Sequence, residues 1–140
     1  MSRFFRLALV LFNCFIHVYA SDTDKLFKSA REGNFSQVKY LLSFKHVDLN
    51  ARDLYRDTPL HYAAMNGHLK IVKYFVNEGA DINTKSVFGR TPLSYAAGNG
   101  YSKTVRFLVK KGAIIDSLSI KIAKLHGYNA IVDYLSEHLN

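Results

Sequence analysis

Cysteine and proline are scarce in this 140-residue chain, which has one cysteine, two prolines and no tryptophan. The single cysteine, Cys14, lies in an N-terminal segment that we expect to be removed, so the mature chain would hold no thiol. A chain without thiols forms no disulfide, no thiolate metal site and no cysteine nucleophile. Acidic residues are also few, 11 against 19 Lys and Arg, and the resulting net charge of +8 would draw the chain toward anionic surfaces.

The local motifs of catalysis are missing as well. The sequence has no glycine-rich phosphate loop and no motif that suggests a Ser-His-Asp arrangement. A zinc site needs three or four converging ligands, and no Asp, Glu or Cys shares the spacing of His61 and His68. The other histidines that could be considered, His46, His126 and His138, are isolated. We therefore expect no enzyme activity, no cofactor and no metal.

The first twenty residues have the layout of a secretory signal peptide. Arg3 and Arg6 form a short basic start, residues 7–16 are almost wholly apolar, and small or modest side chains precede a break after Ala20. An uncleaved membrane anchor is the alternative, although the apolar stretch is short for a span that needs roughly 20 residues. We expect residues 1–20 to be cleaved and the protein to be exported, to a periplasm or to the cell exterior.

A repeated segment dominates the rest of the chain. Residues 57–68 and 90–101 are nearly the same, and the step from Thr58 to Thr91 is 33 positions (91 − 58), as is the step from Gly67 to Gly100 (100 − 67). A fixed period of this size predicts a stacked array of helical repeats. The domain of residues 21–140 then divides into four units, at approximately 22–50, 51–83, 84–116 and 117–140.

Each central unit begins with a strong helix start. A threonine hydroxyl can accept a hydrogen bond from an amide of the first turn, and proline at the first helical position loses no hydrogen bond. Glycine then permits the turn into a second helix with one apolar face and lysines opposite it. The residues that we expect to build these units are Thr58, Pro59, Leu60, His61, Gly67, Thr91, Pro92, Leu93 and Gly100.

The end units are variants of the central ones. The last unit follows at an offset of 27 (127 − 100), so six residues of the looping hairpin are missing from it, and it is more polar. Degenerate ends with a polar outer side keep a repeat array soluble. We expect a short solenoid with a capping unit at each end.

The sequence Thr58-Pro59-Leu60-His61, with its following Ala pair, Gly-His and Gly-Ala-Asp-Ile-Asn, resembles the ankyrin repeat over roughly residues 22–140. The resemblance implies an all-α ankyrin-repeat solenoid of stacked helix-turn-helix units with β-hairpin loops, two full repeats plus N- and C-terminal capping repeats. It implies that His61 and the threonine hydroxyl brace the helix start. Two residues depart from the family pattern. Arg56 replaces a glycine in a loop turn, which we expect to be strained or reshaped. Ser94 replaces the motif histidine, which we expect to weaken hydrogen bonding in that unit.

The resemblance also places the partner-binding residues, on the loop tips and on the concave side of the inner helices. Tyr55 and Phe88 are large apolar groups on loops without a core to fill, and aromatic anchors of this sort are typical hot spots. The alternative is that they pack against neighbouring loops. The candidate loop residues are Leu54, Tyr55, Asp57, Val87, Phe88 and Arg90, and the candidate inner-helix residues are Arg31, Glu32, Met65, Asn66, Gly98, Asn99, Leu125 and His126.

The fold class therefore favours a non-enzymatic, exported protein–protein interaction module, monomeric by itself, with an unidentified partner and with inhibitor, immunity factor or scaffold as its candidate roles. The basic face of the second helices leaves two interpretations open. It is either a solvated surface that keeps the protein soluble or a surface that attracts an acidic partner or anionic lipid headgroups. The alternative function is a peripheral membrane or anion-binding protein. Nucleic acid is the weaker option, because an exported protein seldom meets it.

Overall fold

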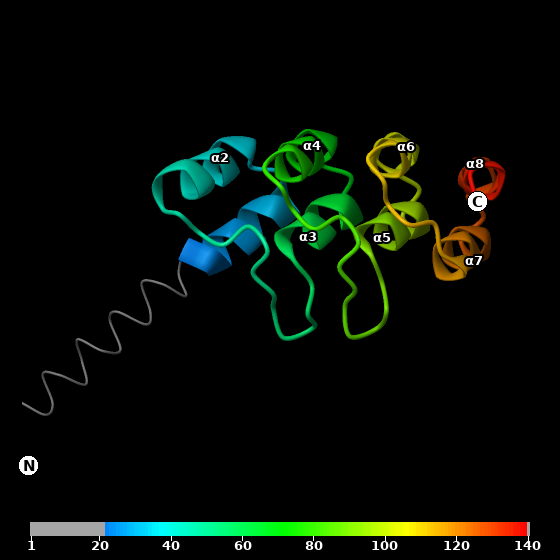
Figure 1. Cartoon of the computed structure of the whole chain (residues 1–140), viewed down its shortest axis with the longest axis horizontal. Helices are drawn as coiled ribbons and strands as arrows, with labels where there is room; N and C mark the ends of the chain where they lie inside the picture. Colours follow the sequence, from blue (N-terminus) through cyan, green and yellow to red (C-terminus); the bar gives the residue numbers. More distant parts are fainter. Residues whose placement is uncertain (1–21, 140) are drawn as a thin grey trace, which may run out of the picture.

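The computed structural model describes residues 22–139, which form a row of paired antiparallel helices (Figure 1). The predicted signal peptide, residues 1–20, and Cys14 lie outside the described residues. Residues 22–32 are helical and pair with the first labelled helix. The labelled helices are α2 (Phe35–Phe44), α3 (Pro59–Met65), α4 (Leu69–Asn77), α5 (Pro92–Gly98), α6 (Ser102–Lys110), α7 (Ser117–Leu125) and α8 (Asn129–Glu137).

The helices lie in two layers. The upper layer in Figure 1 contains the outer helices, which are α2, α4, α6 and α8. The layer below it contains the inner helices, which are residues 22–32, α3, α5 and α7. The loops before α3 and α5 extend below the inner layer as two adjacent fingers, whereas α6 and α7 are joined by residues 111–116 alone. The predicted all-α solenoid of helix-turn-helix units is confirmed, including its shortened last loop.

The sequence explains where each inner helix begins. Thr91 caps α5 by accepting a hydrogen bond from the amide of Ser94 at 3.2 Å, and Pro92 occupies the first helical position. In the last unit Asp116 replaces threonine, and its carboxylate accepts from the amide and the hydroxyl of Ser119 at 2.8 and 2.6 Å. The loss of the Thr-Pro start in the last unit therefore leaves the cap intact.

The hydrophobic core fills the space between the two layers. Leu60 and Leu93 of the inner helices and Val72, Val105 and Leu108 of the outer helices are almost completely buried. The paired alanines of α3 and α5 are buried as well, which lets neighbouring inner helices approach closely. Each unit therefore buries its apolar face only against its neighbours, and the array folds as a stack.

Hydrogen bonds with the period of the sequence join the loops of successive units. The side-chain oxygen of Asn50 accepts from the amide of Asp81 at 3.0 Å. One repeat later, Asn83 accepts from the amide of Ile114 at 2.8 Å. Because both pairs are 31 residues apart, the two contacts are equivalent and fix the register between units.

The glycines that follow α3 and α5 are required for two reasons. Gly67 has φ +70°, a backbone conformation that other residues adopt only at a cost, and a Cβ built on it would lie 2.4 Å from the ring of Tyr101. Gly100 repeats the arrangement, with φ +79° and a Cβ position 2.5 Å from Tyr128. The aromatic ring at the start of the next outer helix therefore packs directly on the glycine of the preceding unit.

Candidate partner-binding surface

Finger 1 (residues 52–57) folds around one carboxylate. Oδ1 of Asp53 accepts from the amides of Tyr55 and Asp57, both at 2.9 Å, and the amide of Asp53 donates to the carbonyl of Asp57 at 3.0 Å. In finger 2 (residues 85–90), Ser86 occupies the equivalent position and its hydroxyl accepts from the two equivalent amides at 3.2 and 3.3 Å. A short polar side chain that bonds to nearby amides is what holds each tight turn.

Arg56 takes the place of glycine in finger 1 without changing the turn. Its φ is +60°, close to the +71° of Gly89 in finger 2, and its amide donates to the carbonyl of Asp53 at 2.9 Å. A non-glycine residue in this conformation costs roughly 1–2 kcal/mol. The turn is thus strained rather than reshaped. The strain arises because an arginine, and not a glycine, occupies this position at the tip.

The two fingers are tied to each other. The amide of Val87 donates to the carbonyl of Tyr55 at 2.8 Å, and Nη2 of Arg52 donates to the carbonyl of Lys85 at 2.7 Å. The rings of Tyr55 and Phe88 stack with centroids 6.2 Å apart and planes 27° apart. The predicted alternative, packing of loop aromatics against the neighbouring finger, is therefore present in the structure. The fingers form one unit and not two separate loops.

Even so, the aromatic rings and their neighbours remain accessible at the finger tips. The exposed fractions are 96% for Leu54, 56% for Tyr55, 51% for Val87 and 65% for Phe88. These four residues are named the tip cluster. Four exposed cations, Arg52, Arg56, Lys85 and Arg90, come from the same two fingers and are named the tip cations. The guanidinium of Arg90 lies 5.4 Å from the ring centre of Tyr95. An apolar centre with a charged rim is the usual composition of a protein-binding surface.

The prediction that Asp57 contacts a partner is wrong. Asp57 is only 4% exposed, because its side chain turns back under the finger, where Oδ2 accepts from the hydroxyl of Tyr95 at 3.3 Å. Burial, and secondarily the charge of Asp53, raises the pKa of Asp57 to about 6. Tyr95, which belongs to the inner helix α5, thereby secures the base of finger 1.

His61 is a structural residue that links two units. Its Nδ1 accepts from the amide of Thr58 at 3.0 Å and lies 2.9 Å from that residue's hydroxyl, and Nε2 donates to the carbonyl of Arg90 at 3.2 Å. Burial lowers the pKa of His61 to about 4, so the ring is neutral near pH 7. The predicted bracing of the helix start is confirmed, and the link to finger 2 is an addition that the sequence did not show.

Ser94 occupies the position that His61 has one repeat earlier, and it does not weaken the hydrogen bonding of its unit as predicted. The amide of Thr91 donates to the serine hydroxyl at 2.9 Å, and that hydroxyl donates to the carbonyl of Thr91, also at 2.9 Å. The expected weakening within the unit is therefore wrong, because the local bonds are retained. A serine side chain is too short to reach the next unit as the imidazole does.

A groove of about 460 Å³ lies beside finger 1 on the inner side and is lined in part by Phe27, Arg31, Asp53 and Tyr62. The hydroxyl of Tyr62 donates to Oδ2 of Asp53 at 2.6 Å, and the guanidinium of Arg31 lies 4.7 Å from the centre of the tyrosine ring. Burial and the bond to Asp53 raise the pKa of Tyr62 to about 12. The predicted inner-helix residue Arg31 is thus brought next to the base of finger 1.

The other predicted inner-helix residues differ in their exposure. Glu32, Asn99, Leu125 and His126 are exposed, and Met65 and Asn66 are half-buried. Asn99 also donates from Nδ2 to the carbonyl of Met65 at 2.9 Å. Gly98 is buried, and a Cβ built on it would lie 2.5 Å from Ile122, so the prediction that Gly98 contacts a partner is wrong.

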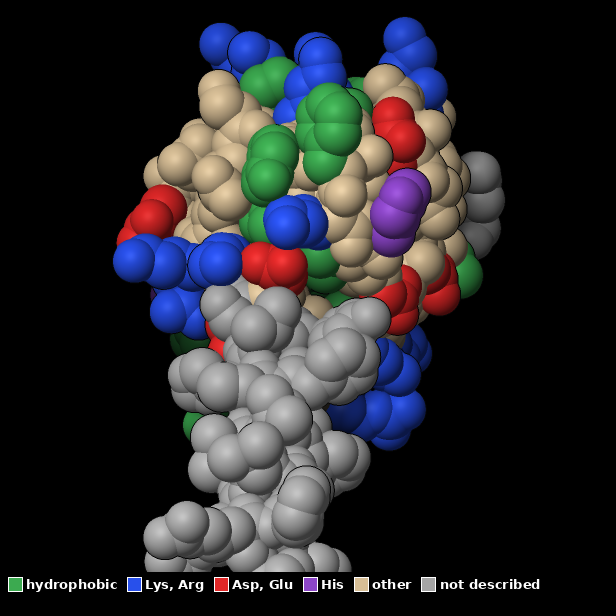
Figure 2. Space-filling view, turned by 90° about the vertical axis from the view of Figure 1, so that its left-hand side faces the viewer, with side chains coloured by type: hydrophobic (Ala, Val, Ile, Leu, Met, Phe, Trp, Pro, Cys, Tyr) green, Lys and Arg blue, Asp and Glu red, His purple; other side chains and the backbone are tan. Residues whose placement is uncertain are grey.

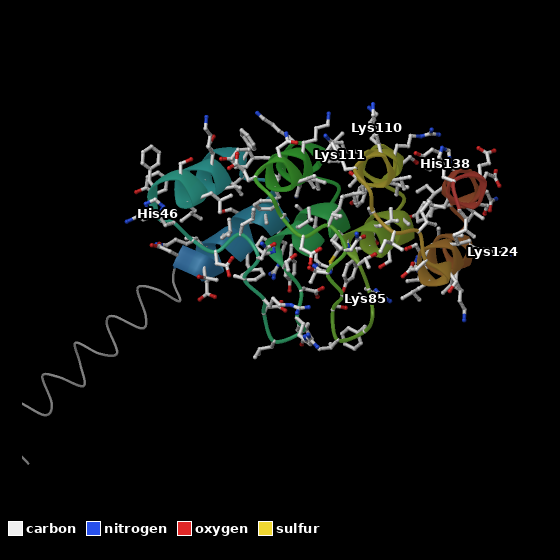
Figure 3. The ribbon with its side chains drawn as sticks, viewed as in Figure 1. His46, Lys85, Lys110, Lys111, Lys124 and His138 are labelled. Atoms are coloured by element: carbon white, nitrogen blue, oxygen red, sulfur yellow. The ribbon has the colours of Figure 1, made fainter. Side chains whose placement is uncertain are left out.

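Three of the four tip cations, Arg52, Arg56 and Lys85, were missing from the predicted partner-binding residues. Arg52 and Lys85 were not predicted, although they are 33 positions apart (85 − 52) and occupy the same place in successive fingers. That equivalence is the signal that could have identified them. Lys85 is labelled beside finger 2 in Figure 3. Within residues 22–139 no group of three or more His, Cys, Asp or Glu side chains could hold a metal ion.

Comparison with known proteins agrees with this architecture. The family model described as ankyrin repeats (3 copies) matches residues 26–119, and the chain belongs to the ankyrin-repeat family. Ankyrin repeats are generally protein–protein interaction modules, typically without enzyme activity.

Curated relatives match over a limited region. The chain is 44% identical over 55 residues to alpha-latroinsectotoxin-Lt1a of Latrodectus tredecimguttatus, covering 39% of this chain and 4% of that protein. It is 40% identical over 55 residues to palmitoyltransferase akr1 of Schizosaccharomyces pombe, covering 39% and 9%. It is 35% identical over 57 residues to human ankyrin repeat domain-containing protein 7, covering 41% and 22%. The chain thus spans only a small part of the length of these relatives.

Proposed function

We propose that the protein is a non-enzymatic binding module that holds a partner protein with its two joined fingers and the adjacent inner helices. The tip cluster is the observation that carries the proposal. Four large apolar side chains are half to almost fully exposed on a rigid pair of turns, and a contiguous exposed apolar patch commonly marks an interaction site. Rigid aromatic anchors bind with little loss of conformational entropy.

The tip cations select for the charge of the partner. The nearest carboxylates, of Asp53 and Asp57, are bonded inward to tyrosine hydroxyls and to finger amides. The tip therefore presents positive charge around an apolar centre, and this favours a partner with an apolar contact bordered by acidic residues. Such complementarity raises the association rate and excludes basic competitors.

Export remains part of the proposal. The support is the basic start and the apolar stretch of residues 1–20, which is typical of a signal peptide. An exported ankyrin-repeat protein of this kind would act as an inhibitor, an immunity factor or a scaffold in the periplasm or outside the cell. Among residues 22–139 no helix is long and apolar enough to cross a membrane.

Affinity capture with matched variants tests the proposal. The test variant is Tyr55→Ala/Phe88→Ala, which removes both stacked rings of the tip cluster. The control is Tyr40→Ala/Phe44→Ala on α2, because these rings are also exposed, 46% and 71%, and pack on each other with centroids 5.6 Å apart. The proposal expects a protein that is retained by the wild type and the control and lost by the test variant. Equal retention by all three would contradict it.

A second candidate function is binding to an anionic surface through the outer helices. The helices α2, α4 and α6 contain no Asp or Glu, but they carry exposed cations that we name the outer ridge. Figure 2 shows Lys and Arg side chains gathered along the upper edge of the molecule. The outer ridge consists of Lys39, Lys70, Lys73, Lys103, Arg106 and Lys110.

Contacts within the protein already engage part of this ridge. Nζ of Lys70 lies 4.1 Å from the ring centre of Phe35, and the guanidinium of Arg106 lies 4.4 Å from that of Tyr134. Attraction to a membrane is worth about 1 kcal/mol per basic residue near the surface and is screened by salt. Vesicle binding that salt abolishes, and that the tip variant does not change, would favour this second candidate.

A further inference from the structure

We propose that the groove between α6 and α8 is a second binding site, which takes a short acidic peptide segment with an apolar side chain. The groove has a volume of about 680 Å³ and is named the end groove. This volume lies within the range of established ligand sites. The end groove is formed by the outer helices and residues 112–115, whereas the fingers extend from the opposite, inner layer (Figure 1).

Three nitrogen-bearing side chains border the end groove. Arg106 and Lys110 come from α6, and His138 directly follows α8. Figure 3 labels Lys110 above α6 and His138 beside α8, on the side of α8 toward α6. Among the described residues that line the groove, none is acidic.

The cations of the end groove have no acidic partner within the described residues. The ion pairs of residues 22–139 are Lys25–Asp22, Lys28–Glu32 and the contact of His61 with Asp57, all at other places. An incoming carboxylate therefore has no internal acid to displace. Because the helix C-terminus at Lys110 contributes negative potential of its own, the site depends on the side-chain charges of Arg106 and Lys110.

Two contacts hold the groove in shape. The guanidinium of Arg106 lies 4.4 Å from the ring centre of Tyr134, which keeps the planar donor group at the edge of the groove. His138 donates from Nδ1 to the carbonyl of Tyr134 at 2.8 Å, and the two rings are 4.2 Å apart. A guanidinium that is already positioned can bind a carboxylate through two parallel hydrogen bonds with less loss of entropy.

The apolar side chains that line the rest of the end groove indicate that the ligand has an apolar part. Val109 and Ile115 line it and are half-buried, and Ile114, at its mouth, is 65% exposed. A simple anion would leave this apolar surface in water, whereas a peptide that pairs a carboxylate with an aliphatic side chain covers it. The partner chemistry is therefore an acidic segment with interspersed aliphatic residues.

A fluorescence-anisotropy titration of the full chain tests the inference. The probe is a fluorescein-labelled peptide of alternating Glu and Leu, and the matched peptide has Gln in place of Glu. The variants are Lys110→Gln, which removes a groove cation, and Lys103→Gln as the control, an exposed cation on the same helix that does not line the groove. A third variant, Ile114→Asp, places a carboxylate at the mouth, and circular dichroism checks that each variant is folded.

The inference expects the Glu peptide to bind about tenfold more tightly than the Gln peptide. Lys110→Gln should weaken binding of the Glu peptide about fivefold, Ile114→Asp should weaken it about tenfold or more, and Lys103→Gln should leave it unchanged. Equal binding of the two peptides would overturn the inference. So would equal loss with Lys110→Gln and Lys103→Gln, or binding to phosphatidylserine vesicles and to neither peptide. Both results would indicate general attraction of anions to the basic outer helices.

Discussion

Acidification should act in opposite directions on Asp57 and His61, two buried side chains at the base of finger 1 whose Oδ1 and Nε2 are 3.8 Å apart. The pKa of Asp57 is raised from 3.8 to about 6, so the folded state binds this proton more tightly than the unfolded state. The free energy of unfolding should therefore increase as the pH falls through about 6. From about pH 7.5 to about pH 5 the gain is about 1.4 kcal/mol.

His61 has the opposite sign. Its pKa is lowered from 6.5 in the unfolded chain to about 4 in the folded protein. The contribution of neutral His61 to the free energy of unfolding is therefore fully present above pH 6.5 and is lost as the pH falls from 6.5 toward 4. Over the same interval the loss is about 2 kcal/mol. The two contributions partly offset each other in the wild type and leave a net loss of about 0.6 kcal/mol, and single substitutions should separate them.

Urea unfolding at both pH values measures the two contributions. Asp57→Asn removes the first, and His61→Ser removes the second while using the residue found at the equivalent position, Ser94. On acidification the stability difference between wild type and Asp57→Asn should grow by about 1.4 kcal/mol, and relative to His61→Ser the wild type should lose about 2 kcal/mol. The exposed Asp133→Asn serves as the control. Differences that stay constant with pH would refute the reasoning.

Four further substitutions test the packing by urea unfolding. Gly67→Ala should lower stability by about 2–4 kcal/mol, because the new methyl group meets Tyr101 and φ is positive. Gly79→Ala should cost only about 1–2 kcal/mol, because φ is positive there too but no atom lies within 4 Å of the new methyl group. Equal effects would contradict the ring contact. Arg56→Gly should stabilise by about 0.5–1 kcal/mol by relieving the strained turn, and a loss would show that the turn is not strained. Asn83→Ala should cost about 0.5–1.5 kcal/mol because it removes the hydrogen bond to the exposed amide of Ile114 in the next loop, and a neutral result would argue against that bond.

The period of the sequence made the fold predictable. A repeat of 33 residues relates every position in one unit to its equivalent in the next. Within each unit, the Thr-Pro signal then located the helix starts at Pro59 and Pro92. A strained turn at Arg56 was one of the two expected outcomes, because Gly89 occupies the same place, and the positive φ of Arg56 is that strain. Local chemistry and periodicity agree along this chain, and such agreement specifies a structure.

The errors arose where the orientation or burial of a residue depends on residues that are distant in the sequence. Asp57 was predicted at a finger tip, but the hydroxyl of Tyr95, 38 positions away, holds it inward. Gly98 was predicted on the inner face, but Ile122 of the next unit covers it. The end groove was missed for the same reason, since its walls come from two helices and a loop that only the stack brings together.

Hydrogen–deuterium exchange of the protein with and without its captured partner tests the central claim most directly, because it maps contact without a substitution. The account predicts that exchange slows in the two fingers, residues 52–57 and 85–90, and along the adjacent inner helices. Protection confined to α2, α4 and α6, with the fingers unchanged, would contradict the account and assign binding to the outer ridge.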